Sequence, residues 1–221
     1  MKKKIEQTGN ITSTKEVILR KSLEMINQGG MMDFRIDVLA LSLNLSPGNI
    51  TYHFAKKEDI SVLLWQQFLV RFDKTLSCVS HILDIKQTFL VFRELALVIY
   101  DLRGVVMFVG ADSRVIKDKS YNVVDFYDIT KNLFKSIGDL LYRNGYLYQP
   151  PKDNHIMAYQ TIMLRWWINK AIIKNGTKIE TKDQIINHNS LLMLFSIYGQ
   201  MNDKAKTEFE YIAKKVAQND I

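Results

Sequence analysis

Residues 46–57, SPGNITYHFAKK, gather the side chains in this sequence that are best suited to recognising a nucleic acid. The amide of Asn49 carries a donor and an acceptor and can pair with base edges, notably those of adenine. Tyr52 and His53 can reach bases or phosphates, while Lys56 and Lys57 add positive charge directly after them. Elements of regular structure must hold this stretch in place.

A helix is expected to begin abruptly inside the stretch. Ser46 is a favourable N-cap and Pro47 suits the first helical position, which predicts a short helix over 47–53. The preceding segment predicts another helix over 36–43, with one apolar face formed by Ile36, Leu39, Ala40 and Leu43. Between them, Asn44 can adopt the left-handed conformation that ends a helix, and Leu45 can fill the space between the two.

The second helix is predicted to keep little apolar surface on its outer side. Ile50 and Phe54 are four residues apart and should point inward. The residues left facing outward are Pro47, Gly48, Asn49, Tyr52 and His53. Gly48 has no side chain to hold a ligand away. Two short helices joined by a tight turn predict a helix-turn-helix, whose second helix can enter a major groove.

Residues 14–65 resemble the N-terminal domain of TetR/AcrR-type transcriptional regulators. The resemblance rests on the end of the first helix at Gly30 and on the pairs Leu39-Ala40, Leu45-Ser46, His53-Phe54 and Lys57-Glu58. It implies an all-α protein that binds double-stranded DNA as a homodimer. It also implies a larger, helical C-terminal domain that holds a small-molecule ligand and dimerises through its last long helices.

Three positions depart from the family pattern. Arg35 lies where a capping Ser or Thr is common, so the cap must come from elsewhere, with Asp33 as one source, and Arg35 is free to contact phosphate. Thr51 lies where a tyrosine usually touches the DNA backbone. Either Tyr52 takes over that contact or Thr51 makes a shorter one. By the resemblance, the DNA-binding set is Arg35, Ser46, Pro47, Gly48, Asn49, Thr51, Tyr52, His53, Lys56 and Lys57.

The rest of the chain predicts helices and little else. Its 221 residues are 47% hydrophobic and contain only three prolines and ten glycines. Cap pairs at Ser13–Glu16, Asp84–Gln87 and Thr181–Gln184 mark helix starts. We predict about ten helices, over 14–28, 36–43, 47–53, 57–81, 85–101, 104–117, 120–144, 155–174, 183–199 and 203–218, with a DNA-binding domain at 1–56 and a second domain at 57–221.

The distribution of charge favours a polyanionic partner, and the cysteine content indicates the cellular compartment. The first 57 residues carry nine lysines and arginines against five acids, so more than half of the net charge of +7 lies in about a quarter of the chain. The N-terminal segment carries three consecutive lysines, Lys2–Lys4, and is either a solvated tail or a DNA-binding arm. With Cys78 as the one cysteine and no apolar leader or membrane-length segment, we expect a cytoplasmic protein without internal disulfides.

The C-terminal region offers residues for a ligand and for a dimer. An aromatic-rich bundle can enclose an apolar pocket for an apolar or amphipathic effector, for which the lining residues would be Phe68, Phe72, Phe92, Tyr100, Phe108, Phe126 and Trp166. The helices at 155–174 and 183–199 carry more apolar surface than one protomer needs. They predict a dimer interface containing Leu164, Ile168, Leu191, Leu194, Phe195 and Tyr198.

Other chemistry finds no support in the sequence. The histidines are isolated, no metal-ligand spacing or phosphate-binding loop occurs, and no set of catalytic groups or cofactor motif stands out. An enzyme is therefore disfavoured. The sequence leaves two readings: a DNA-binding regulator, or a helical interaction protein of the same fold that has lost DNA binding.

Overall fold

The computed structural model describes residues 13–77, 79–82, 84–111, 123–150 and 181–221. Over these residues the chain forms nine α-helices and short 3₁₀ turns, with one isolated β-bridge between Leu147 and Met201. The all-α class predicted from the sequence is therefore confirmed. The predicted helix over 155–174 lies outside the described residues.

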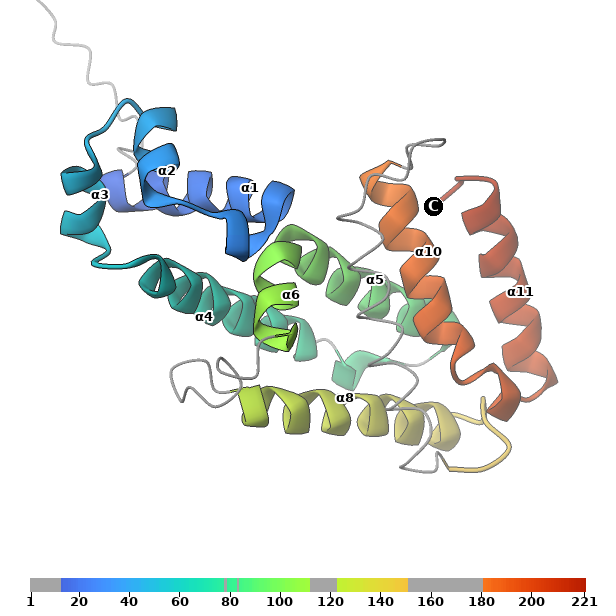
Figure 1. The fold of residues 1–221 in the computed structure, drawn as a ribbon. Helices are drawn as coiled ribbons and strands as arrows, with labels where there is room; N and C mark the ends of the chain where they lie inside the picture. The colour runs from blue at the N-terminus through green and yellow to red at the C-terminus, as the bar shows by residue number, and fades with distance from the viewer. Residues whose placement is uncertain (1–12, 78, 83, 112–122, 151–180) are drawn as a thin grey trace, which may run out of the picture.

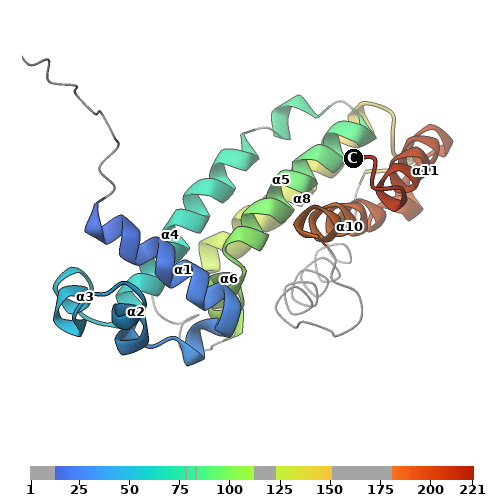
Figure 2. The ribbon, with the colours of Figure 1, turned by 90° about the horizontal axis from the view of Figure 1, so that it is seen from above.

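The first helices form one end of the molecule (Figures 1 and 2). There α1–α3 lie together, α4 leads from them into the bundle, and α10 and α11 lie at the far end. The bounds are α1 Thr14–Asp33, α2 Ile36–Ser42, α3 Pro47–His53, α4 Lys57–Leu76, α5 Ile85–Asp101, α6 Arg103–Ala111, α8 Val123–Arg143, α10 Lys182–Phe195 and α11 Asp203–Ala217.

The predicted cap pairs set three of the helix starts. Ser13 and Glu16 form a reciprocal capping box at α1, and Thr181 and Gln184 form another at α10. At α5, the carboxylate of Asp84 accepts a hydrogen bond from the backbone N–H of Gln87 at 2.7 Å. Each cap satisfies amides of the first turn that have no partner within the helix.

Several predicted helices end earlier than the apolar pattern suggested. α4 ends at Leu76 rather than at residue 81, and α10 ends at Phe195 rather than at 199, each followed by a 3₁₀ turn. The pattern continues past these ends because apolar residues such as Val79 and Ile197 are still buried in the core. Within α1, Gly30 leaves helical geometry at φ 82°, where the resemblance placed the end of the first helix.

One buried apolar cluster runs from α1–α3 into the C-terminal helices. α4 contacts α1 as well as α5 and α6, so it joins the first three helices to the bundle. Its first residue, Lys57, coincides with the predicted domain boundary. The division into domains at 1–56 and 57–221 stays a prediction.

α6 approaches the backbone of α1 unusually closely at Gly104. A Cβ atom built on Gly104 would lie 2.3 Å from the backbone oxygen of Ile26, so only glycine fits. Beside this contact, Asn27 accepts a hydrogen bond from the N–H of Gly104 at 2.9 Å and donates one to the backbone oxygen of Asp101 at 2.7 Å. The Asn27 amide thus holds the corner between α5 and α6 against α1.

None of the helices in the described ranges combines the length and the hydropathy that crossing a membrane requires.

We expect Gly104→Ala to lower the free energy of unfolding by about 1–3 kcal/mol, because the added methyl group must push α6 away from α1. Gly29→Ala is the matched control, since a Cβ there meets nothing within 4 Å. That substitution should be neutral or stabilising by up to about 1 kcal/mol. Urea unfolding of both variants checks this, and equal stabilities for the two would contradict the close approach.

Candidate nucleic-acid interface

The turn between α2 and α3 has the geometry that its sequence predicts. Asn44 has φ 53°, in the left-handed region. The N–H of Leu45 donates to the backbone oxygen of Ala40 at 2.9 Å, which closes the end of α2. Leu45 itself packs half-buried against the core. Both predicted roles, Asn44 as helix terminator and Leu45 as spacer, are confirmed.

α3 begins and packs as predicted. The hydroxyl of Ser46 accepts a hydrogen bond from the N–H of Asn49 at 3.2 Å, and Pro47 occupies the first helical position. Ile50 and Phe54 are 0% and 4% exposed, so they anchor the helix to the core. These two residues fix which side of α3 faces solvent.

The solvent face of α3 is polar and open. Pro47, Gly48, Asn49 and Thr51 are exposed, and Tyr52 is 85% exposed. His53 is only half-buried rather than fully outward, with its ring edge-on to that of Tyr52 at a centroid distance of 5.1 Å. The predicted outward face of α3 is thus exposed, with His53 at its margin.

Thr51 turns its hydroxyl back to its own helix, where it donates to the backbone oxygen of Gly48 at 3.1 Å. Threonine commonly makes this bond when no other partner is available. The ring of Tyr52, by contrast, projects into solvent. Of the two alternatives for the backbone contact, both are exposed, but the Thr51 hydroxyl is bonded within α3 whereas the Tyr52 ring extends from it.

Positive charge lies just beyond α3. Lys56 is exposed and Lys57 is half-buried at the start of α4, where the N–H of Lys56 donates to the carboxylate of Asp59 at 3.1 Å. The ammonium of Lys15 at the start of α1 lies 5.5 Å from the ring centre of Phe54. Sequence reasoning missed Lys15 because it stands far from the motif in the chain.

Arg35 has a partner within its own helix end. Its guanidinium forms a two-point ion pair with Asp37, which is the largest cause holding the pKa of that carboxyl below its usual value. The side chain of Arg35, the N-cap residue of α2, makes no capping hydrogen bond. A cap from Asp33 stays a prediction. A phosphate contact by Arg35 stays a prediction, and the phosphate would have to compete with Asp37.

The predicted ligand residues fall into three groups. Phe68, Phe72 and Phe92 are buried in the core, where Phe68 stacks on Trp65 at 4.8 Å between ring centres. Tyr100 and Phe108 are half-buried. The side chains of Phe126 and Trp166 lie outside the described residues. A pocket lined by this set stays a prediction.

The predicted dimer surface needs one correction. Leu194 is 0% exposed within a single chain, so the place given to it at a subunit interface is wrong; it packs in the core of its own protomer. Phe195 is 49% exposed, while Leu191 and Tyr198 are half-buried. Leu164 and Ile168 lie outside the described residues.

No model of a known protein family matches the sequence, and no curated protein does. Solved structures do. A TetR-family transcriptional regulator from Marinobacter aquaeolei is 17% identical with a TM-score of 0.75, covering 93% of this chain and 99% of that one. The ketosteroid transcriptional regulator KstR2 of Mycobacterium tuberculosis is 11% identical with a TM-score of 0.63, covering 88% and 98%. A regulator from Saccharomonospora viridis in complex with choline is 17% identical with a TM-score of 0.59, covering 85% and 97%.

The chain has the TetR-family regulator fold. The resemblance carried by residues 14–65 predicted this TetR fold, and the structural match extends it across nearly the whole chain. Within this fold, α3 is a short helix at one end of the molecule (Figure 1), and its polar side chains are exposed.

We expect Ser46→Ala to destabilise the protein by about 0.5–2 kcal/mol, because it removes the hydrogen bond that caps α3. Thr51→Ala is the control on the same helix; its hydroxyl bonds only to an exposed carbonyl, so the change should stay within about 0.5 kcal/mol. Thermal unfolding of the two variants measures the difference. A larger loss in Thr51→Ala than in Ser46→Ala would contradict the assigned cap.

Proposed function

We propose that this protein is a sequence-specific DNA-binding transcriptional regulator, acting as a homodimeric repressor whose DNA affinity is controlled by a small molecule. The observation that carries the proposal is the solvent face of α3: Asn49 and Tyr52 stand exposed on a helix anchored by Ile50 and Phe54. The fold shared with TetR-family regulators supports the same reading.

Gly48 supports a close approach of another molecule to α3. A Cβ atom on this residue would meet only the hydroxyl oxygen of Ser46, at an ordinary 3.7 Å. The fold therefore does not require glycine here, and alanine in its place would make the helix more stable. A duplex whose backbone or base edges come within contact distance of α3 gives glycine a reason to stand at this position.

In this account α3 lies in the major groove and its residues divide the work. Asn49 pairs with a base edge near the start of the helix, and Tyr52 contacts a thymine methyl group or a phosphate. Lys56 and Lys57 meet phosphates, together with the free amides at the start of α4. Lys15, at the start of α1, adds a positive charge near the C-terminal end of α3, with its ammonium 5.5 Å from the ring centre of Phe54.

A homodimer would place two α3 helices one turn of DNA apart and so select a palindromic site. An apolar or amphipathic ligand in the C-terminal helices would lower DNA affinity if it binds better to a dimer with the wrong spacing. The Saccharomonospora viridis neighbour was solved with choline, which supports a small-molecule site in proteins of this fold.

The alternative is a helical interaction protein of the same fold that no longer binds DNA. Thr51, at the position of a usual backbone contact, favours it; the exposed Asn49 and Lys56 favour DNA binding. Selection of duplexes from a random pool separates the two. Enrichment of one palindrome supports the regulator, and a pool that stays random after repeated selection would support the interaction protein.

Asn49→Ala should cost about 1–3 kcal/mol on the selected duplex and relax the choice of one base pair per half-site, because it removes a base contact. Lys57→Ala should weaken selected and scrambled duplexes alike and reduce the salt slope by about one, because it removes a phosphate contact. Titrations at two salt concentrations distinguish them. The opposite result, in which Lys57→Ala alters base preference and Asn49→Ala weakens all duplexes equally, would contradict the proposed placement of α3 in the groove.

Gly48→Ala should raise the stability of the free protein by up to about 1 kcal/mol while weakening DNA binding. The methyl group favours the helix and fits within the chain, but it stands between α3 and the duplex. Melting temperature and DNA affinity are measured on the same preparation. Unchanged DNA affinity in a stabilised variant would show that nothing approaches α3 at this residue.

A further inference from the structure

Asp101, the last residue of α5, is bound by side chains from three other helices. Its carboxylate accepts hydrogen bonds from Arg71 of α4 at 2.8 Å and from Lys182 of α10 at 2.7 Å. Its backbone oxygen accepts one from Asn27 of α1 at 2.7 Å. A single residue therefore joins α10, at the far end of the bundle, to α1 and α4, which lead to the DNA-reading helix.

The Asp101 side chain is held firmly in this position. It is 28% exposed and lies between two cations. Burial raises the pKa of its carboxyl, but the hydrogen bonds from Arg71 and Lys182 outweigh burial and hold that pKa below its usual value. Near neutral pH the carboxylate is thus charged, and both of its charge-assisted bonds are present.

One neighbouring ring and a second cation beside it limit where the Lys182 ammonium can move. Its ammonium lies 5.5 Å from the ring centre of Tyr100, and the guanidinium of Arg103 lies 4.6 Å from the same ring. Arg103 also donates to the backbone oxygen of Tyr100 at 3.0 Å. A second cation beside Tyr100 disfavours movement of Lys182 toward α6, which leaves Asp101 as its anionic partner among the described residues.

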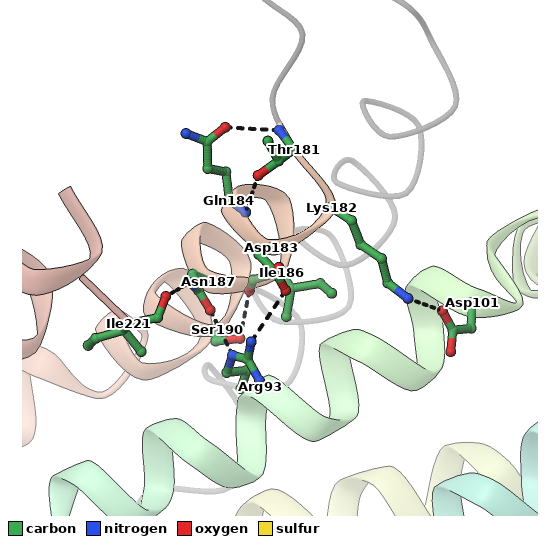
Figure 3. A network of polar contacts seen from close by, with 10 residues as sticks. All are labelled: Arg93, Asp101, Thr181, Lys182, Asp183, Gln184, Ile186, Asn187, Ser190 and Ile221. Atoms are coloured by element: carbon green, nitrogen blue, oxygen red, sulfur yellow. Dashed lines mark hydrogen bonds and ion pairs between the residues drawn. The ribbon is translucent and has the colours of Figure 1, made fainter. Parts of the chain in front are cut away.

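A second polar contact between α5 and α10 provides a comparison (Figure 3). Arg93 of α5 donates to Asn187 at 2.9 Å and pairs with Asp183 at 3.4 Å, both on α10. Asn187 in turn donates to the backbone oxygen of Ile221 at 2.7 Å. This contact leads to Ile221, beyond the end of α11, whereas the contacts of Asp101 reach α1 and α4.

We propose that Asp101 is a positioning residue that transmits the placement of α10 to α1 and α4, and thereby sets the orientation of the α3 reading helix. This inference rests on the proposed function, since it names how the DNA-reading end is regulated. Lys182 links Asp101 to α10, whose placement is transmitted. Arg71 and Asn27 link Asp101 to α4 and α1, which receive the displacement.

The contact transmits displacement because its partners cannot adjust independently. If α10 shifts along α5, Lys182 either breaks its bond to Asp101 or draws the carboxylate with it, and a displaced carboxylate strains the bond from Arg71 to the other oxygen. The Asn27 amide binds the same residue through the backbone and also caps α6 at Gly104. A displacement of Asp101 therefore reaches α1 and α4 together. α1 packs against α2, which packs against α3, and α4 follows α3 in the chain.

Two variants of α10 separate this role from simple loosening of the bundle. Lys182→Met removes the charge but keeps the apolar stem beside Tyr100, and breaks the contact at Asp101. Asp183→Asn breaks the other ion pair between the same two helices and leaves Asp101 intact. In each pair the substituted residue is the more exposed partner, Lys182 at 47% and Asp183 at 74%, and the residue that stays is 28–29% exposed, so the effects of the two substitutions on melting temperature should be similarly small.

The readout is the affinity for the selected duplex divided by the affinity for the same duplex with one half-site scrambled. The full site needs two correctly placed α3 helices, whereas the half-site needs one. We expect Lys182→Met to lower this ratio roughly twofold to thirtyfold, Asp183→Asn to leave it unchanged, and Lys182→Arg to preserve it. In an Asp101→Asn background, Lys182→Met should add nothing further.

Hydrogen exchange of the free protein gives a test that does not depend on DNA. Lys182→Met should speed exchange of amides near Asn27 and Arg71, and Asp183→Asn should not. Equal effects of the two variants on exchange or on the duplex ratio would overturn the inference. So would an equal loss on full and half sites. If the wild-type chain selects no duplex, the proposed function fails, and the exchange result still decides whether Asp101 couples α10 to α1 and α4.

Discussion

The close approach of α6 to α1 is the contact on which the arrangement of this molecule depends. A carbonyl oxygen of α1 occupies the space that any side chain on Gly104 would need, and the Asn27 amide satisfies a donor of α6 and an acceptor of α5 at the same place. Backbone packed this closely has little freedom to slide. The position of α1–α3 relative to the C-terminal helices is therefore set at one corner, between α5 and α6.

Close packing also explains how α3 is held at its end of the molecule. α3 is too short to be stable by itself, so Ile50 and Phe54 must hold it against the core while Ser46 fixes its start. Its remaining surface is exposed, and under the proposed function this surface reads DNA. A small rigid helix on a firmly placed support gives the precision that reading base edges requires, because an error in the support moves every contact at once.

Local sequence signals predicted local structure well. Asn44, Ser46 and the cap pairs at Ser13 and Thr181 specify backbone geometry within a few residues, and their roles were confirmed. Contacts between distant segments were not predictable in the same way. Asn27 and Gly104 are 77 residues apart, and neither residue type signals such a contact. The prediction that Leu194 lies at a dimer interface was wrong for a related reason, because an apolar helix face does not reveal whether its own chain or a second chain covers it.

The central claim, that α3 reads DNA, is tested most directly by a crystal structure of the chain bound to its selected duplex. The account predicts two copies of the chain on the palindrome, each with α3 in the major groove and the Asn49 amide within hydrogen-bond distance of a base edge. It predicts the Lys57 ammonium beside a phosphate. A complex in which the duplex contacts another surface, with the exposed face of α3 turned to solvent, would contradict the account.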